Sequence, residues 1–233
     1  MYMRLILIAQ ILCLSYSAMS QAAYSYGFNL AVGASRVPMS GEGIDFKAKV
    51  APSGLAGIFF LTKLKTRGLL GVEVNISQVE GRWSSNELIL DGAGNTVGTS
   101  STSGRQHITY VSLPVYTGIT MKSWSVYGGL QVGLAASGKR ANNTINLVNG
   151  DETTSEQLGN LSIILPDAGV RAGVIWRVSN KISLEAKYYQ GLLNIFDQET
   201  TKSNYTWLTQ QLTIGARFAI RNTNDCGTCP AWN

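Results

Sequence analysis

His107 is the only histidine in a chain of 233 residues, so an acid–base site that depends on an imidazole has a single candidate. Glu87 and Asp91 are the carboxylates expected to approach it, as a hydrolase or acyltransferase site would require. No P-loop, His-Glu-x-x-His or Gly-x-Ser-x-Gly motif is present. A histidine without a motif is typical of a solvated side chain. The sequence therefore predicts no enzyme, with no catalytic residues, no cofactor and no metal site.

Three glycines, Gly92, Gly94 and Gly98, lie close together in the segment DGAGNTVG, a composition also found in phosphate-binding loops. Such a loop needs a strand before it and a helix after it, and this context is missing. Asp91-Gly92 and Asn149-Gly150 are instead hairpin signals, because residues typical of strands flank both of them. We therefore expect both segments to form hairpins that extend a sheet outward.

Cys226 and Cys229 form a Cys-x-x-Cys pair in the final segment of the chain. Four interpretations are open: a redox site, half of a zinc site, a local disulfide or an inert pair. No βαβ pattern surrounds the pair and no second Cys or His pair is available to complete a zinc site. An oxidising compartment would favour the local disulfide.

The N-terminal segment indicates such a compartment. Arg4 precedes an apolar stretch from Leu5 to Leu14, and small residues follow. This order is typical of a secretory signal peptide, which we place at residues 1–22. The alternative, an uncleaved membrane anchor, is disfavoured because the apolar stretch is shorter than the ~20 residues that a helical span needs.

The rest of the chain shows the period of two that is typical of β-strands. From Ala168 to Val178, every second residue is apolar, while Arg171 and Arg177 lie between them. The same reading predicts eight strands, at 24–35, 54–65, 69–83, 105–120, 123–137, 163–178, 181–193 and 206–220. Tight connections alternate with long ones, as in outer-membrane barrels. The predicted fold is all-β, an eight-stranded antiparallel transmembrane up-and-down β-barrel over residues 23–220, with a periplasmic tail at 221–233.

The two faces of these strands differ in chemistry. The apolar face is expected to contact lipid, as at Phe60, Val74, Leu113, Val132, Val174, Leu184 and Ile214. The opposite face carries charges of both signs, which we expect to neutralise one another inside the barrel: Glu73, Asp167, Arg171, Arg177, Glu185, Lys187 and Arg217. Tryptophans near both ends of the strands are predicted interfacial aromatics: Trp83, Trp124, Trp176 and Trp207.

The charge content agrees with this fold and argues against a nucleic-acid partner. Charged residues make up 14% of the chain, whereas ordinary soluble domains have roughly 25%. The 19 Lys and Arg exceed the 14 Asp and Glu only mildly and are spread along the chain. A nucleic-acid-binding face would gather them. Outer-membrane lipid is the predicted surrounding.

Three segments resemble the PorT-like group of small outer-membrane β-barrels of Gram-negative bacteria: SGLAGIFFLTKLKTRGLLGVEVNISQVEG, ITYVSLPVYTGITMKSWSVYGGLQVGLAAS and ISLEAKYYQGLLNI. The resemblance covers nearly all of the chain after residue 22. The sequence departs from the group at Leu61 and Ser112, where relatives often carry an acidic residue, and in its tail. The resemblance implies an outer-membrane location and, through PorT itself, a link to secretion.

Three functions follow from these observations. The first is a non-enzymatic surface-binding protein, or an accessory of an envelope or secretion complex, that acts through long extracellular loops. The second is a porin-like channel for small solutes, which is disfavoured because side chains just fill an eight-stranded barrel. The third is an outer-membrane hydrolase or acyltransferase, which is disfavoured by the single histidine.

Overall fold

The computed structural model describes residues 23–40, 47–64, 67–148, 151–160, 166–195 and 206–222. The predicted signal peptide at 1–22 and the pair Cys226 and Cys229 lie outside these residues. Every regular element in the described part of the chain is a strand: β1 (Ala23–Arg36), β2 (Met39–Ser40), β3 (Lys47–Lys49), β4 (Ala51–Lys63), β5 (Gly68–Leu90), β6 (Thr96–Met121), β7 (Trp124–Val148), β8 (Asp151–Asn160), β9 (Asp167–Arg177), β10 (Ile182–Gly191), β11 (Thr206–Trp207) and β12 (Gln210–Asn222).

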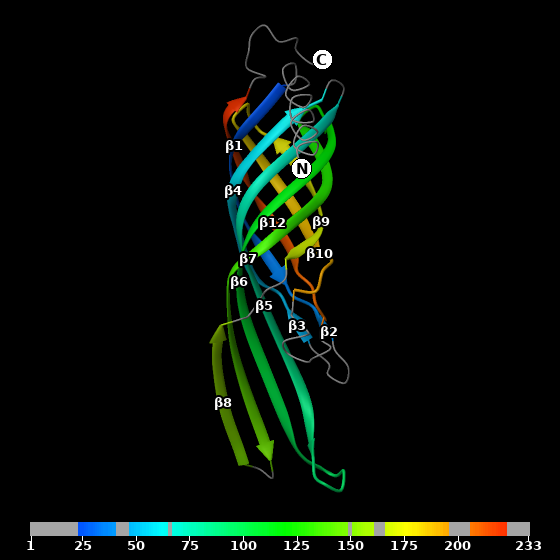
Figure 1. Ribbon diagram of the computed structural model, residues 1–233, viewed down its shortest axis with the longest axis vertical. Coiled ribbons are helices and arrows are strands. Elements are labelled where there is room, and N and C mark those ends of the chain that lie inside the picture. Colours follow the sequence, from blue (N-terminus) through cyan, green and yellow to red (C-terminus); the bar gives the residue numbers. More distant parts are fainter. Residues whose placement is uncertain are drawn as a thin grey trace, which may run out of the picture.

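Eight of these strands pair in a ring, with neighbours antiparallel throughout. The order is β5-β4-β1-β12-β10-β9-β7-β6, and β6 pairs with β5 in turn, so the sheet closes on itself. Figure 1 shows the cylinder that results. Strands β1 and β12, which lie at opposite ends of the described chain, pair directly from Ser25 with Asn222 to Arg36 with Gln210.

The predicted number of eight strands is wrong, because the described residues form twelve. Strand β3 pairs with β5, β8 pairs with β7, and β2 and β11 form a separate two-stranded sheet. These four additions were missed because they are short or polar, and a period of two is not visible in such segments. The eight predicted segments do correspond to the eight strands of the ring.

Strands β5, β6 and β7 extend far beyond their neighbours. Strand β4 pairs with β5 only as far as Gln78, whereas β5 and β6 remain paired up to Leu90 and Thr96. This extension was expected from the two hairpin signals. The first turn differs from the two-residue form: it spans residues 91–95, and Gly94 has the positive φ of 86° that favours glycine. The extended strands and β8 form the long projection at the bottom of Figure 1.

The two ends of the cylinder are different. We call one end the turn end, because strands are joined there by tight turns. Met121 pairs with Trp124 across the two-residue turn of Lys122 and Ser123, as expected from the tight connections. The first residue of β1 and the last of β12 lie at this end too. The projection lies at the other end, here the loop end.

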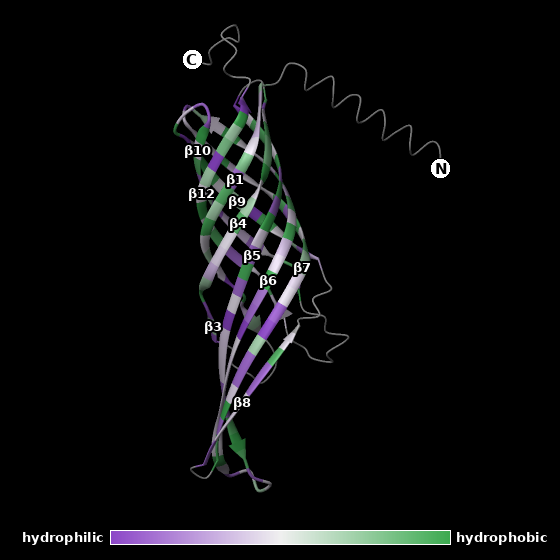
Figure 2. Ribbon diagram, turned by 90° about the vertical axis from the view of Figure 1, so that its left-hand side faces the viewer, coloured by the Kyte–Doolittle hydropathy of each residue, from purple (hydrophilic) through white to green (hydrophobic). Residues whose placement is uncertain are grey.

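The outer face of the cylinder is apolar over most of its height, and Figure 2 shows hydrophobic residues recurring along its strands. Five of the seven residues expected to face lipid are at least two-fifths exposed, whereas Phe60 and Val174 are half-buried. The exposed five are Val74, Leu113, Val132, Leu184 and Ile214. In the described part of the chain, no helix is long and apolar enough to cross a membrane.

Candidate functional site

Five charged side chains from four strands meet inside the cylinder, and we call them the interior charge network: Glu73, Arg171, Glu185, Lys187 and Arg217. All five are odd-numbered residues of β5, β9, β10 and β12, whose odd positions point inward because successive side chains of a strand alternate between the two faces. Each is at most 4% exposed. The sequence-predicted charges are therefore brought together except for Asp167 and Arg177.

Arg217 is the centre of the network. Its Nη2 lies 2.5 Å from Glu73 Oε1 and also binds Glu185 Oε1, so one guanidinium joins carboxylates from two strands. Its Nη1 donates a hydrogen bond to the hydroxyl of Tyr116 at 3.0 Å. The Tyr116 hydroxyl donates in turn to Glu73 Oε1 at 2.9 Å. Charge-assisted hydrogen bonds of this kind are stronger than neutral ones.

The second oxygen of each carboxylate is also occupied. Glu185 Oε2 lies 2.8 Å from Lys187 Nζ, while its Oε1 accepts a hydrogen bond from the Tyr127 hydroxyl. Glu73 Oε2 lies 3.3 Å from Arg171 Nη2 and accepts hydrogen bonds from two amides, Asn29 at 3.0 Å and Asn75 at 2.9 Å. The network therefore has three cations around two carboxylates, and these contacts connect opposite walls of the cylinder.

Asp167 lies apart from the network, towards the loop end. Its Oδ2 accepts a hydrogen bond from the Thr209 hydroxyl, and its backbone pairs with Gly133. The expectation that it is neutralised by an interior cation is wrong, since its side chain is bonded to the Thr209 hydroxyl and to no cation among the described residues. Residue 167 begins β9, four residues before Arg171, so it lies nearer to the loop end than Arg171 does.

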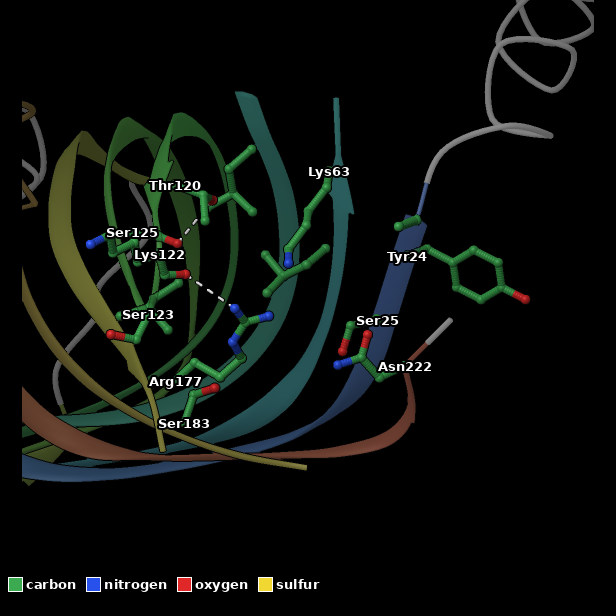
Figure 3. Close-up of a pocket in the computed structure, with 14 residues that line it drawn as sticks. Tyr24, Ser25, Lys63, Thr120, Lys122, Ser123, Ser125, Arg177, Ser183 and Asn222 are labelled. Atoms are coloured by element: carbon green, nitrogen blue, oxygen red, sulfur yellow. Dashed lines mark hydrogen bonds between the residues drawn. The ribbon is translucent and has the colours of Figure 1, made fainter. Parts of the chain in front are cut away.

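Arg177 also lies outside the network, at the turn end. Its Nη2 donates to the carbonyl oxygen of Lys122 at 3.1 Å, and it lines a pocket with Lys63 and several hydroxyl residues. Figure 3 shows the Lys63 amine and the Arg177 guanidinium directed into this pocket. Residue 177 is the last of its strand, so its side chain meets solvent at the rim.

The four tryptophans fall into two different environments. Trp124 and Trp176 are 47% and 41% exposed at the turn end, where their rings stack with centroids 5.4 Å apart. Trp83 and Trp207, in contrast, are 5% and 2% exposed, so the prediction that they are interfacial is wrong. Residue 83 is odd-numbered on β5 and points inward, and Trp207 lies in β11, which pairs with β2 inside the loop end.

These two indoles help to close the loop end of the cylinder. They belong to a buried apolar cluster with Val37, Met39, Val79, Ile108, Tyr110 and Ile195. The guanidinium of Arg140 lies over both rings, 5.6 Å from the centroid of Trp83 and 5.5 Å from that of Trp207. A smaller cluster lies between the charge network and the turn end, and it consists of Leu69, Tyr116, Tyr127 and Ile175. Sequence reasoning missed Arg140 because an arginine above buried indoles leaves no mark on strand periodicity.

His107 meets a different carboxylate from the one expected. Glu80 pairs with it across β5 and β6, and its Oε2 lies 3.6 Å from His107 Nδ1. Glu87 and Asp91 lie farther along the extended hairpin, and Asp91 is in its turn. The expected approach of Glu87 or Asp91 is therefore wrong. The correct partner was recognisable only from the register of the two strands, which places residue 107 opposite residue 80.

A family model described as "Outer membrane protein beta-barrel domain" matches residues 15–197. The chain belongs to this family. It is therefore an outer-membrane protein of the Gram-negative type, and the closed sheet is its barrel. The apolar outer face then contacts lipid, and the exposed pair Trp124 and Trp176 lies at one edge of that face, where indoles favour the bilayer interface. Asp167 differs from these outer residues, because its side chain faces the interior of the barrel.

Solved structures of outer-membrane proteins are similar to the barrel at low identity. Ail, the attachment invasion locus protein of Yersinia pestis, is 12% identical, with 83% of this chain and 98% of that chain covered and a TM-score of 0.39. Neisserial surface protein A is 14% identical, with 82% and 96% covered and a TM-score of 0.35. OprG of Pseudomonas aeruginosa is 11% identical, with 86% and 95% covered and a TM-score of 0.32. A comparison with curated proteins found no match.

Proposed function

We propose that the protein is a non-enzymatic, non-conducting outer-membrane barrel that binds a protein partner through its projection. The projection consists of residues 83–104, which are the far parts of β5 and β6 with their turn, residues 141–148 of β7, and β8. The observation that carries the proposal is this four-stranded sheet beyond the closed barrel. Porin-like conduction is not supported, because the charge network and two apolar clusters fill the interior of the described barrel.

The orientation of the barrel is part of the proposal. Barrels of this class place their short turns in the periplasm and their long loops outside the cell. The turn end therefore faces the periplasm, together with the first residue of β1 and the last of β12. The projection then extends from the cell surface, where a binding partner is accessible.

The surface of the projection is suited to a partner that is both basic and apolar. Its only charged residues are acidic: Glu87, Asp91, Asp151, Glu152 and Glu156. Large apolar side chains are exposed among them, with Leu88 at 66% and Leu158 at 84%. Leu88 and Leu147 flank Thr99 on neighbouring strands, so apolar groups from two strands adjoin. Exposed apolar groups framed by charge are typical of protein-binding surfaces.

The edge of β8 offers a second means of recognition. Within the described residues β8 pairs only with β7, so the backbone groups of its other edge have no strand partner there. Such an edge can accept an additional strand from a binding partner. An envelope or secretion-complex protein that adds a strand here would be held by main-chain hydrogen bonds and by Leu158.

The test is site-specific photocrosslinking in intact cells that express the full chain. A photoreactive residue replaces Leu88, 66% exposed on the projection, in one variant and Leu130, 66% exposed on the lipid-facing wall, in the matched control. We expect discrete protein adducts from position 88 and none from position 130. The absence of adducts at 88, or the same adducts at both positions, would contradict the proposal. Labelling of a Ser155→Cys variant with a membrane-impermeant maleimide tests the orientation separately.

A further inference from the structure

Five cationic side chains gather on the outer face of the barrel, just beyond its apolar surface, and we call them the basic belt: Lys47, Lys49, Arg82, Arg105 and Lys139. Strand register places them side by side. Lys49 pairs with Arg82, and Arg82 pairs with Arg105 on the next strand. One row closer to the apolar surface, His107 pairs with Lys139. All five lie on strands β3, β5, β6 and β7, whose outward positions they occupy.

A buried carboxylate holds the two arginines of the belt in place. The Glu80 side chain is 4% exposed, and its Oε1 lies 2.6 Å from Arg82 Nε and 2.9 Å from Arg105 Nε. The arginine side chains nevertheless stay 43% and 52% exposed. One carboxylate cannot neutralise five cations, so the belt keeps an excess of positive charge. The guanidinium groups are thus positioned in advance and still present donors to a ligand.

The belt lies at a defined height above the lipid-contacting surface. Before the belt, the last large apolar residues on the outer face of β5, β6 and β7 are Ile76, Val111 and Leu134. Arg82 lies six residues after Ile76, and Arg105 lies six residues before Val111. At ~3.3 Å per residue and a tilt near 40°, six residues correspond to roughly 15 Å of height. This places the belt outside the hydrocarbon, on the side of the polar headgroups.

Charge is segregated along the projection. Beyond Arg82, Arg105 and Arg140, the segments 83–104 and 141–160 contain no lysine or arginine. The only charged residues in these segments are acidic. Cations needed merely for solubility would be spread over the whole projection. Their confinement to one height indicates a ligand at that height. A hollow on this face is lined by Lys49, Arg82 and Arg105 on one side and by Glu156 and Leu158 on the other.

We propose that the basic belt binds the phosphate groups of lipid A, the phosphorylated glycolipid of the outer leaflet. Arg82 and Arg105 contact phosphate with the guanidinium donors that Glu80 leaves free, and Lys47, Lys49 and Lys139 add charge around them. The acyl chains then lie on the apolar wall of β5, β6 and β7, and the acidic projection extends beyond the charged sugar layer. The inference rests on the orientation proposed above and is independent of any protein partner.

The experiment measures binding of lipid A to the full-length barrel folded in a neutral detergent. The probes are diphosphoryl lipid A, the same lipid after enzymatic dephosphorylation, phosphatidylglycerol and inorganic phosphate. We expect saturable binding of diphosphoryl lipid A that weakens with added salt, and little binding of the dephosphorylated lipid. Equal binding of phosphatidylglycerol would overturn the choice of lipid, and full competition by inorganic phosphate at equal concentration would indicate a free-anion site instead.

Two variants and a matched control make the test specific. The double variant Lys49→Gln with Lys139→Gln removes two exposed charges, and the triple variant Glu80→Gln, Arg82→Gln and Arg105→Gln removes the arginines without leaving a buried carboxylate unpaired. The control, Arg67→Gln with Lys181→Gln, removes two charges at the turn end. We expect the triple variant to bind lipid A at least about tenfold more weakly and the control to stay within about twofold.

Folding of every variant is confirmed by heat-modifiable migration on gels before binding is compared. If the folded triple and double variants bind lipid A as the unmodified chain does, the belt is not the site and the proposal is wrong. The failure of the partner proposal would appear in the crosslinking experiment instead, because neither variant changes the projection beyond the belt.

Discussion

Arg217 is held between two carboxylates in the buried interior of the barrel, so its removal has a cost that a surface charge would not have. With the guanidinium gone, Glu73 and Glu185 lose a shared partner while both stay buried. Breaking a buried ion pair costs about 3–5 kcal/mol when the remaining member is left uncompensated. Here Glu73 keeps Arg171 and Glu185 keeps Lys187, so the cost should lie near the lower end of that range. We expect Arg217→Met to lower the free energy of unfolding of the barrel by that amount in denaturant titrations in lipid vesicles.

The matched control is Arg177→Met, which removes the same group at the rim. Its guanidinium is part-exposed and binds a backbone carbonyl, so we expect a change below about 1 kcal/mol. Adding Glu73→Gln and Glu185→Gln to Arg217→Met should lower the stability further, since Arg171 and Lys187 then stay buried without a carboxylate partner. Equal effects of the two single substitutions would show that the interior network does not stabilise the fold.

Asp91 allows a prediction about pH at the outermost turn. The backbone N–H of Asn95 and its side-chain amide donate to the carboxylate at 2.8 and 3.1 Å, and the N–H of Ala93 donates at 2.9 Å. These hydrogen bonds favour the ionised form and lower the pKa of Asp91 below its ordinary value. Because the folded pKa is the lower one, the turn gains stability above the ordinary pKa of an aspartate and loses it as the pH falls through the lowered value.

The measurement is a carboxyl NMR titration of the barrel against a short peptide of the sequence 91–95. Asn95→Ala removes only the side-chain donor, so the pKa of Asp91 should move part of the way back towards the peptide value. A titration identical to that of the peptide would contradict the hydrogen-bonded turn.

At this scale the sequence revealed which residue types face inward but not which of them meet. Alternation placed Glu73, Arg171, Glu185, Lys187 and Arg217 on one face correctly. Whether two inward residues touch depends on strand register and tilt, which single-strand periodicity does not contain. Asp167 and Arg177 show this limit. Both face inward on the same strand as Arg171, yet Asp167 lies towards the loop end of the network and Arg177 towards the turn end. Trp83 was misplaced because proximity to a loop was given more weight than its odd position on β5.

Among the strands, β5 and β6 fit together because a glycine lies beneath a tyrosine ring. A Cβ atom added to Gly71 would lie 2.2 Å from the ring of Tyr116, its cross-strand partner. The ring must then shift, and with it the hydroxyl that donates to Glu73. We expect Gly71→Ala to destabilise the barrel by about 1–3 kcal/mol, the usual cost of overpacking. Gly92→Ala, where an added Cβ meets nothing, is the control; similar unfolding curves for both variants would contradict the prediction.

The lipid-facing wall gives a second prediction about a strand. Val74 is 43% exposed on β5, amid the apolar outer face. Arginine near the bilayer midplane of a barrel costs about 2–4 kcal/mol, whereas near the interface the cost is close to zero. Val74→Arg should therefore reduce folding into vesicles by that free energy, and Gln78→Arg, one step beyond the apolar surface on the same face, should not. An unaffected Val74→Arg variant would show that this wall does not contact lipid.

The eight strands of the ring were predictable because each has one uniform apolar face, the strongest signal that a strand can carry. The far parts of β5, β6 and β7 are solvated on both faces, so their alternation disappears at about the point where lipid contact ends. Their length was foreseen only through turn residues such as Asp91 and Gly92. Strand β8, rich in Thr, Ser and Glu, has no periodicity that could reveal it, and its pairing follows from the extended β7 beside it.

For the molecule as a whole, the packed interior predicts that the barrel does not conduct. The charge network lies between two apolar clusters, and the buried side chains include Arg217, Tyr116 and Ile108. Eight-stranded barrels have room for side chains but for little else. We expect no stable conductance steps when purified protein is added to planar bilayers. Steady, well-defined steps would overturn this prediction and favour the porin-like alternative.

The pairing of β1 with β12 also sets the order of events during biogenesis. Closure joins residues such as Ser25 and Asn222, so the first strand has no partner on that side until the last strand has been synthesised and delivered. Until then the unpaired backbone edges of both strands are open to other chains, and the loop to be closed is nearly the whole barrel. We therefore expect the newly exported chain to depend on periplasmic chaperones, and a chain truncated before Gln210 to be degraded rather than inserted.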